Sequence, residues 1–385
     1  MLARPASQLP QFTDGSRQWT RAVRVLGKSY ALDGLRGLAW CLVFLGHVQP
    51  FRLFDPADTG MFIFFALSGF LITQLAVDEF ARKGSIDMRA FVRRRVVRLV
   101  PALVVFVGLW LVVAASFIGS PWLTTVPQGG PSRVMSLPAA FEGVGVALAY
   151  VMNWFEIEKL FSTYVPLGHI WSLAVEMQFY ILWISLLLLI LRFGRRAALW
   201  VAIIGSAMAS FEALVLMHYG AHWLRVYMGT DTRGGALLGG AAAALFWSDS
   251  RICLKGSRLF SLAALLAGIS MIWSIYSLAG PESAVSQEIA WPITALAASV
   301  MTMYLVDRPA SWLSRLMSRR TIRYLGKRSY ALYLWHYVWL TWFRDLGFEG
   351  VVAALVMSLL SAELSWRLVE KPASRWRAPA LQRAT

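Results

Sequence analysis

Long apolar runs recur along this chain of 385 residues, and they constrain its fold more than any other feature of the sequence. Each run has roughly 15 to 22 residues, which is the length that a helix needs to cross the hydrocarbon core of a bilayer. Hydrophobic residues make up 58% of the sequence and charged residues only 15%, which is far from the balance of a soluble domain. The sequence therefore predicts an all-α, polytopic membrane protein rather than a soluble protein with a large core.

Ten of these runs predict transmembrane helices. An eleventh apolar segment, 139–153, is a weaker candidate for a transmembrane helix than its neighbours, so whether it spans the membrane is open. The ten predicted spans are 35–54, 60–77, 99–118, 170–191, 197–216, 233–247, 259–279, 288–306, 329–343 and 350–366.

The charges of the loops indicate how segment 139–153 lies. Lys and Arg in short loops stay on the cytoplasmic side of the membrane. If 139–153 does not span, all but six of the 37 Lys and Arg residues fall on one side, and if it spans this asymmetry largely vanishes. We therefore predict that both termini are cytoplasmic and that 139–153 is a re-entrant or flat segment of the outer leaflet. The net charge of +16 then reflects membrane orientation, and no nucleic-acid partner is predicted.

Outside the spans the chain has little room for further domains. We predict a basic cytoplasmic tail over 1–28, one transmembrane domain over 29–373 and a second cytoplasmic tail over 374–385. The first tail is polar and basic, so we expect no cleavable signal peptide. Cys41 is predicted in a span and Cys253 in a cytoplasmic loop, which argues against a disulfide and against a cysteine-ligated metal site.

Arg36 and His47 lie within one predicted span, where ionisable residues are costly and indicate function by default. Their spacing puts both side chains on one helix face, about 16 Å apart along the axis. Arg36 also fits an orientation anchor whose guanidinium group reaches the membrane surface. A neutral imidazole such as that of His47 can act as a general base near pH 7. The predicted topology puts Arg36 near the cytoplasmic surface and His47 beyond the midplane.

His169, Ser172 and Glu176 form a second cluster on one face of another predicted helix. This helix starts at the outer surface, so Glu176 is expected about two turns into the membrane. One interpretation is a helix end with a single buried, hydrogen-bonded carboxylate. The other is that Glu176 tunes or orients a nearby histidine.

Four arginines fall within residues 93–98, at the cytoplasmic entry of the third span. They fit plain positive-inside anchoring or contact with lipid headgroups. Arginine is also suited to bidentate recognition of phosphate, so a phosphate-bearing cytosolic ligand would fit.

Two further positions have both a structural and a functional interpretation. His336 lies within a span amid aromatic residues and is either bonded to a neighbouring helix or part of a pocket. Arg233 follows Asp231 and Thr232 at the outer start of a span, where a local ion pair explains the motif equally well as substrate binding.

Taken together, these segments resemble the acyltransferase-3 family of integral-membrane acyltransferases. The matching stretches run in family order along nearly the whole chain. They are Leu32–Gly37 with the ten-residue gap from Arg36 to His47, Phe65–Thr73, Arg95 and Arg98 followed by Pro101, His169–Leu173 with Glu176, Phe179 and Tyr180, Asp231–Arg233, Ser329–His336 and Val369–Pro372.

The resemblance implies an enzyme that moves an acyl group, usually acetyl, from cytosolic acyl-CoA to a hydroxyl group of a sugar, polysaccharide, lipid or secondary metabolite. It also implies ten spans, residence in a bacterial inner membrane, and no metal. The donor-binding residues it implies are Arg36, Arg95 and Arg98, and the catalytic ones are His47, His169 and Glu176. For the substrate we expect contacts from Ser172, Tyr180, Arg233 and His336.

The spacing of Arg36 and His47 suits an extended pantetheine arm that crosses half the membrane. His47 would then deprotonate an acceptor hydroxyl group or hold the acyl group transiently, and direct transfer is the interpretation we favour. We expect Glu176 and His169 to orient His47 or the acceptor. No C-terminal esterase-like domain is recognised, so we expect the transmembrane domain to complete the transfer.

Two other classes of protein stay open at this stage. A non-enzymatic transporter or flippase of a lipid-linked sugar would also be polytopic with charges inside the membrane. A polyprenyl-phosphate-dependent transferase would require acidic metal-binding loops outside, and the predicted outer carboxylates form no tight motif.

Overall fold

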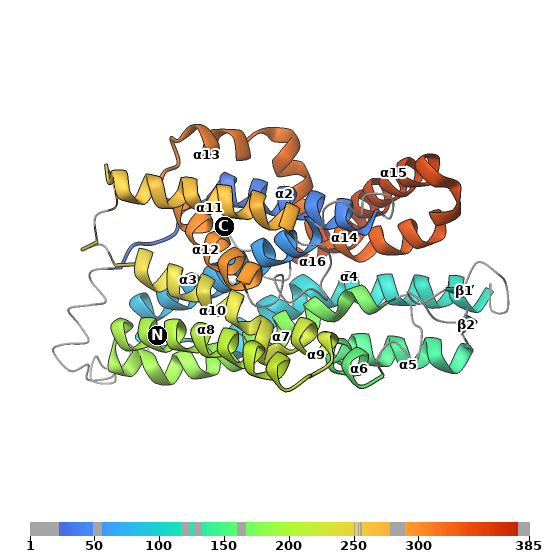
Figure 1. The fold of residues 1–385 in the computed structure, drawn as a ribbon, viewed down its shortest axis with the longest axis horizontal. Coiled ribbons are helices and arrows are strands. Elements are labelled where there is room, and N and C mark those ends of the chain that lie inside the picture. The colour runs from blue at the N-terminus through green and yellow to red at the C-terminus, as the bar shows by residue number, and fades with distance from the viewer. Residues whose placement is uncertain are drawn as a thin grey trace, which may run out of the picture.

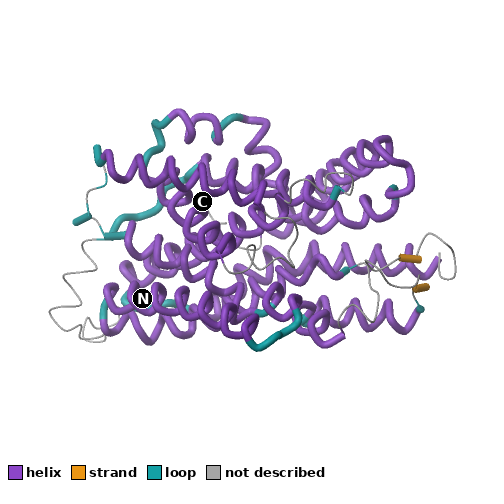
Figure 2. The backbone as a smooth tube through the Cα atoms, viewed as in Figure 1, coloured by secondary structure: helices purple, strands orange, loops and turns teal. Residues whose placement is uncertain are grey.

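The computed structural model describes residues 23–48, 56–116, 124–125, 133–134, 136–159, 167–249, 251–252, 254, 256–277 and 289–375, and these are almost entirely helical (Figures 1 and 2). The first α-helices are α2 (Tyr30–His47), α3 (Pro56–Lys83), α4 (Met88–Ser116), α5 (Leu137–Leu148), α6 (Met152–Lys159), α7 (Trp171–Ile190) and α8 (Arg195–His218). The later ones are α9 (Trp223–Met228), α10 (Thr230–Trp247), α11 (Arg258–Ser277), α12 (Trp291–Asp307), α13 (Trp312–Met317), α14 (Arg320–Trp342), α15 (Gly347–Ser365) and α16 (Lys371–Ser374).

Short elements complete the described chain. Three 3-10 turns, η3 (Gly168–Ile170), η4 (Leu191–Phe193) and η6 (Arg344–Leu346), adjoin the longer helices, and η7 (Trp366–Glu370) is a π-helical turn. The two-residue strands β1 (Thr124–Thr125) and β2 (Arg133–Val134) pair antiparallel.

The described part of each of the ten predicted spans lies largely in a helix, which confirms a polytopic all-α membrane protein, and residues 49–54, 117–118, 278–279 and 288 of these spans lie outside the described residues. Six helical segments of the described chain are long and apolar enough to cross a membrane by themselves: Pro56–Lys83, Met88–Ser116, Gly168–Phe193, Arg195–His218, Arg258–Tyr276 and Arg344–Ser374. The other four predicted spans correspond to α2, α10, α12 and α14, which are shorter or contain more polar and charged residues. Ten spans therefore stay a prediction from loop charge.

Segment 139–153 forms most of α5 and the start of α6. Helix α5 packs along the C-terminal half of α4 (Figure 1), which fits the re-entrant alternative better than the flat one. The chain reverses between the two helices at Tyr150, whose φ of 56° lies in the left-handed region.

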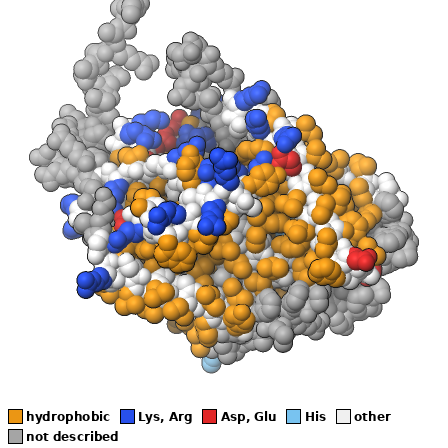
Figure 3. Space-filling view, turned by 90° about the horizontal axis from the view of Figure 1, so that it is seen from above, with side chains coloured by type: hydrophobic (Ala, Val, Ile, Leu, Met, Phe, Trp, Pro, Cys, Tyr) orange, Lys and Arg blue, Asp and Glu red, His pale blue; other side chains and the backbone are white. Residues whose placement is uncertain are grey.

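Contacts at one end of the molecule join segments that loop charge assigns to the cytoplasm. Arg24 pairs with Asp307 at 3.2 Å, and Arg195 pairs with Asp249. The backbone N–H of Arg24 donates to the carbonyl of Ser248 at 2.8 Å. On the face that Figure 3 shows, Lys and Arg side chains gather in one half and the remainder is mainly hydrophobic. The N-terminal segment and the ends of α8, α10 and α12 therefore lie on one side.

Glycines allow two pairs of helices to approach at backbone distance. A Cβ atom on Gly326 of α14 would collide with the carbonyl of Asp33 in α2, and one on Gly69 of α3 would collide with the carbonyl of Leu237 in α10. Small residues at such crossings let helices pack closely in membranes. Helix α2 is thereby held against α14, which brings their side chains together.

Candidate functional site

A pocket with about 630 Å³ of empty space opens among α2, α3, α4, α7 and α14. Six of the ten predicted site residues line it, although they come from three separate segments of the sequence. These are Arg36, Arg95, Arg98, Ser172, Glu176 and Tyr180.

The pocket is rich in positive charge. Three arginines line it, and Glu176 is the one carboxylate among its described lining residues. The guanidinium group of Arg95 lies 5.6 Å from the ring centre of Phe91 and 5.5 Å from that of Tyr180. Its Nε is buried and has no hydrogen-bond partner among the described residues. An excess of cations with an unsatisfied donor suits a ligand with phosphate groups.

Glu176 lies in this arginine pocket and not beside the histidines. Its Oε1 accepts hydrogen bonds from the hydroxyl groups of Ser68 and Tyr180, and its charge acts on Arg36 and Arg95. From the sequence we expected Glu176 to orient His47 or the acceptor. Glu176 is instead hydrogen-bonded to Ser68 and Tyr180. Ser68 was not predicted as a site residue, although it lies in a stretch of small residues that the sequence analysis used for the resemblance.

Three predicted histidines from three separate segments form a second cluster. His336 Nε2 lies 3.4 Å from His47 Nδ1, and the centres of the two rings are 5.2 Å apart. The ring of His169 lies 5.8 Å from that of His336. No group of three or more His, Cys, Asp or Glu in the described chain is placed to hold a metal ion.

The contacts of the ring nitrogens indicate which of them carry protons. His336 Nδ1 lies 2.7 Å from the carbonyl of Tyr333, and His47 Nδ1 lies 2.8 Å from the carbonyl of Val43. Because a carbonyl can only accept, each Nδ1 carries the hydrogen of a neutral ring. His336 Nε2 then faces the N–H of His47 as an acceptor, and His47 Nε2 is left unprotonated. No described residue hydrogen-bonds to His47 Nε2, so this atom can act as a base.

Tyr333 separates the arginine pocket from the histidine cluster. It lines the pocket, and its ring centre lies 5.5 Å from that of His336. Its hydroxyl group donates to the carbonyl of His169 and lies 2.6 Å from Ser172 Oγ, which donates to it. The hydroxyl groups of Ser172 and Tyr333 are therefore hydrogen-bonded to each other. Tyr333 was not among the predicted site residues, although it precedes His336 by three residues and so shares its helix face.

His169 is fixed against α14. Its Nε2 lies 3.1 Å from the carbonyl of Leu334, and its ring stacks on that of Tyr337 with centres 5.0 Å apart. The ring of Tyr337 also lies edge-on to His47 at 5.2 Å. The ring of Tyr337 also lies edge-on to that of His336, with centres 6.4 Å apart, so Tyr337 contacts all three histidines.

Arg233 lies apart from the other nine predicted residues. It is buried, its Nε donates to the carbonyl of Tyr227 at 2.6 Å, and its guanidinium group lies 3.8 Å from the ring centre of Trp291. Its Nη2 lies 3.7 Å from a carboxylate oxygen of Asp58. Arg233 lines a different pocket, with about 350 Å³ of empty space.

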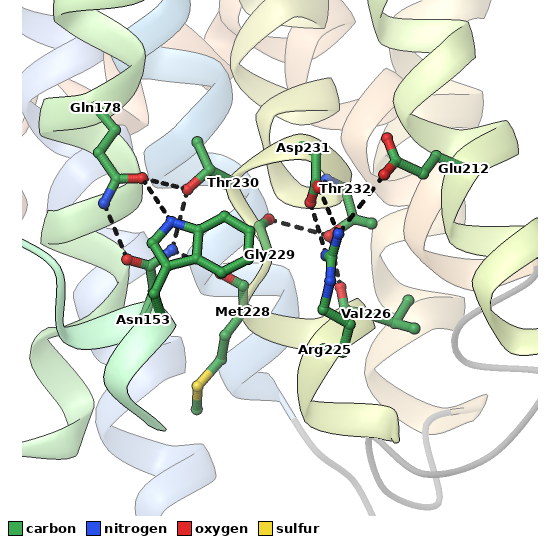
Figure 4. A network of polar contacts seen from close by, with 11 residues as sticks. Asn153, Gln178, Glu212, Arg225, Val226, Met228, Gly229, Thr230, Asp231 and Thr232 are labelled. Atoms are coloured by element: carbon green, nitrogen blue, oxygen red, sulfur yellow. Dashed lines mark hydrogen bonds and ion pairs between the residues drawn. The ribbon is translucent and has the colours of Figure 1, made fainter. Parts of the chain in front are cut away.

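The neighbours of Arg233 form a polar network around the start of α10 (Figure 4). Arg225 pairs with Asp231 at 2.8 Å and with Glu212 at 3.6 Å. The ion pair of Asp231 is therefore with Arg225 and not with Arg233, as a local pair within the Asp231–Arg233 motif would require. Gln178 donates to Asn153 at 3.0 Å, and Thr230 donates to Gln178 at 2.5 Å. The network ties α6, α7 and the start of α10 together.

Comparisons with known proteins agree on one family. The family model described as an acyltransferase domain matches residues 29–367. YrhL of Bacillus subtilis is 32% identical over 89% of this chain and 54% of its own length. The peptidoglycan O-acetyltransferase OatA of Listeria monocytogenes is 30% identical over 89% of this chain and 55% of its own. The O-acetyltransferase OatA of Staphylococcus aureus is 28% identical over 89% of this chain and 56% of its own.

The chain thus spans about half the length of the curated relatives it matches. No solved structure matches it significantly.

Proposed function

Because the chain belongs to the acyltransferase-3 family, we propose that it transfers an acetyl group from cytosolic acetyl-CoA to a hydroxyl group of an acceptor at or beyond the membrane. The relatives named as O-acetyltransferases support transfer to oxygen, and the names of two of them, YrhL and the Listeria OatA, include peptidoglycan. We propose a glycan, lipid or metabolite as the acceptor and a bacterial inner membrane as the location.

The observation that carries this proposal is the adjacency of the two clusters. Tyr333 lines the arginine pocket, and its ring centre lies 5.5 Å from that of His336 in the histidine cluster. Arg36, Arg95 and Arg98 would bind the phosphates of the donor by charge-assisted hydrogen bonds. The distance of about 16 Å along α2 from Arg36 to His47 is the reach that an extended pantetheine arm provides.

The donor would supply the acyl group as a thioester, and His47 would supply the base. His47 Nε2 takes the proton of the acceptor hydroxyl group, whose oxygen forms a bond to the thioester carbonyl carbon. The carbon–sulfur bond breaks, and the proton passes from His47 to the leaving sulfur. No net proton is consumed or released. Because His47 Nδ1 donates to Val43, the ring is held with Nε2 as the free nitrogen throughout.

The first experiment measures CoA release from acetyl-CoA by the purified protein in detergent. We expect His47→Ala to lower the rate by about 100-fold or more while CoA still binds. His218→Ala, at an exposed residue outside the site, is the matched control. Full activity of His47→Ala would reject the role of His47, and no CoA release by the unmodified protein would favour a transporter or flippase.

The second experiment tests donor binding. Arg95→Ala combined with Arg98→Ala should raise the KM for acetyl-CoA at least tenfold and lower kcat less. Arg93→Ala removes an exposed charge from the same basic run and should leave the KM unchanged. An unchanged KM in the double variant would reject phosphate binding by these arginines.

A further inference from the structure

Asp58 lies on α3 at the point where that helix meets the end of α2 that carries His47. Asp58 is 3% exposed and its charge acts on His47. The backbones meet at the same point, because a Cβ atom on Gly46 would lie 2.5 Å from the Cβ of Ala57. The residues next to these two in sequence are His47 and Asp58.

The groups around His47 include few charges. Helix α14 contributes His336 and Tyr337, and His169 of η3 lies behind them. Among the carboxylates of the described residues, Asp58 of α3 is the one whose charge acts on His47. Glu176, the carboxylate that the sequence assigned to this role, is engaged in the arginine pocket.

The charge of Asp58 is only partly compensated. One oxygen accepts a hydrogen bond of 2.7 Å from Trp291 Nε1. The other lies 3.7 Å from Arg233 Nη2, which is longer than a hydrogen bond. Arg233 is kept at this distance by its bond to the carbonyl of Tyr227 and by the rings of Trp291 and Tyr227, 3.8 and 4.3 Å from its guanidinium carbon.

An incompletely paired carboxylate suits a neighbour that becomes positive only during the reaction. In the proposed transfer His47 carries a positive charge between taking and returning the proton. A buried imidazolium is costly without an opposite charge nearby. A carboxylate fully neutralised by arginine would offer little stabilisation, and one without arginine would also favour the charged ring before the reaction begins.

We propose that Asp58 is a positioning residue that stabilises the protonated state of His47, and that Arg233 sets how much of this negative charge His47 experiences. Arg233 then acts through Asp58 and does not contact the substrate. The role of Asp58 in the reaction rests on the proposed function. The electrostatic coupling of Asp58 and Arg233 to His47 does not, because it can be measured without catalysis.

The coupling can be tested by titrating His47 directly. The chain has five histidines, so nuclear magnetic resonance of protein labelled at histidine Cε1 resolves few signals, and His47→Gln assigns the signal of His47. We expect Asp58→Asn to move the titration midpoint of His47 to lower pH and Arg233→Gln to move it to higher pH, each by about half a pH unit or more. Arg233→Lys keeps the charge and should restore a midpoint near that of the unmodified protein.

Controls and a kinetic measurement complete the test. Asp345→Asn and Arg315→Gln change exposed residues and should not move the midpoint. The acidic limb of the pH profile of CoA release should shift in the same directions as the midpoints, with the KM for acetyl-CoA within twofold. Equal midpoints in the Asp58 and Arg233 variants, or shifts in one common direction, would overturn the inference. Opposite midpoint shifts without any CoA release would uphold the coupling and reject the proposed function.

Discussion

His336 Nε2 lies 3.4 Å from His47 Nδ1, and this contact links the two helices that carry the proposed base and its nearest polar neighbour. Both Nδ1 atoms are directed at backbone carbonyls of their own helices. The consequence is a fixed direction of hydrogen bonding, from His47 toward His336, that leaves His47 Nε2 free to accept a proton. His336 is therefore expected to support the base without being one.

The first prediction concerns this supporting role. His336→Leu removes the acceptor that faces His47 and should lower kcat for CoA release by about 10- to 100-fold, because the ring of His47 is then less well oriented. His336→Gln offers a carbonyl acceptor in a similar place and should recover most of this loss. The KM for acetyl-CoA should change in neither variant. A loss as large as that of His47→Ala would contradict the supporting role and indicate a direct one.

The second prediction concerns the hydroxyl group of Tyr333. Tyr333→Phe removes the bonds to Ser172 and to the carbonyl of His169, and leaves both of these buried groups without that partner. The expected cost is about 1 to 3 kcal/mol of stability, seen as a lower Tm in detergent. Donor KM should be unchanged, since the arginines keep their contacts. Tyr219→Phe, at a residue that is 82% exposed, is the control and should leave Tm unchanged.

The sequence was sufficient to predict the helices because their signal is local. Each apolar run is long enough to specify a helix, and the described residues of each of the ten runs contain a helix of their own. The sequence was also sufficient to select nine of the ten predicted residues that the structure collects in two adjoining clusters. A shared helix face joined Arg36 to His47 and His169 to Ser172 and Glu176, and the other residues were expected from the family resemblance.

The partners of these residues depend on contacts between distant segments and could not be predicted. Glu176 shares a helix face with His169, which made a histidine its expected partner. The close approach of α3 instead brings Ser68 to this carboxylate. Asp58 lies between the predicted spans 35–54 and 60–77, and its place near the end of α2 depends on the packing of Gly46 against Ala57. No local pattern specifies either contact.

The third prediction concerns the approach of α2 to α14. Gly326→Ala places a methyl group against the carbonyl of Asp33, so the two helices must separate. We expect a loss of about 2 kcal/mol or more of stability and a strong loss of CoA release, because the contact between His47 and His336 depends on this approach. Gly145→Ala, at a glycine of α5 with no atom within 4 Å of the added methyl group, should leave both quantities near their original values. Equal behaviour of the two variants would show that the close approach is dispensable.

The fourth prediction concerns Glu156 of α6, which is 1% exposed and whose Oε2 has no hydrogen-bond partner among the described residues. Burial raises the pKa of its carboxyl group to about 8. The folded protein therefore holds this proton more tightly than the unfolded chain, for which a pKa near 4.5 applies. The stability contributed by the protonated group is complete below about pH 4.5 and is lost as the pH rises through about 8.

Glu156→Gln should remove this dependence, because an amide stays uncharged. We expect the Tm of the unmodified protein to fall between pH 6 and pH 9 relative to that of the variant, with a difference equivalent to about 1 to 3 kcal/mol at pH 9. Glu158→Gln, two residues further along α6 and exposed, is the matched control and should follow the unmodified protein at every pH. Parallel Tm curves for Glu156→Gln and the unmodified protein across this range would show that the carboxyl group is not held protonated by burial.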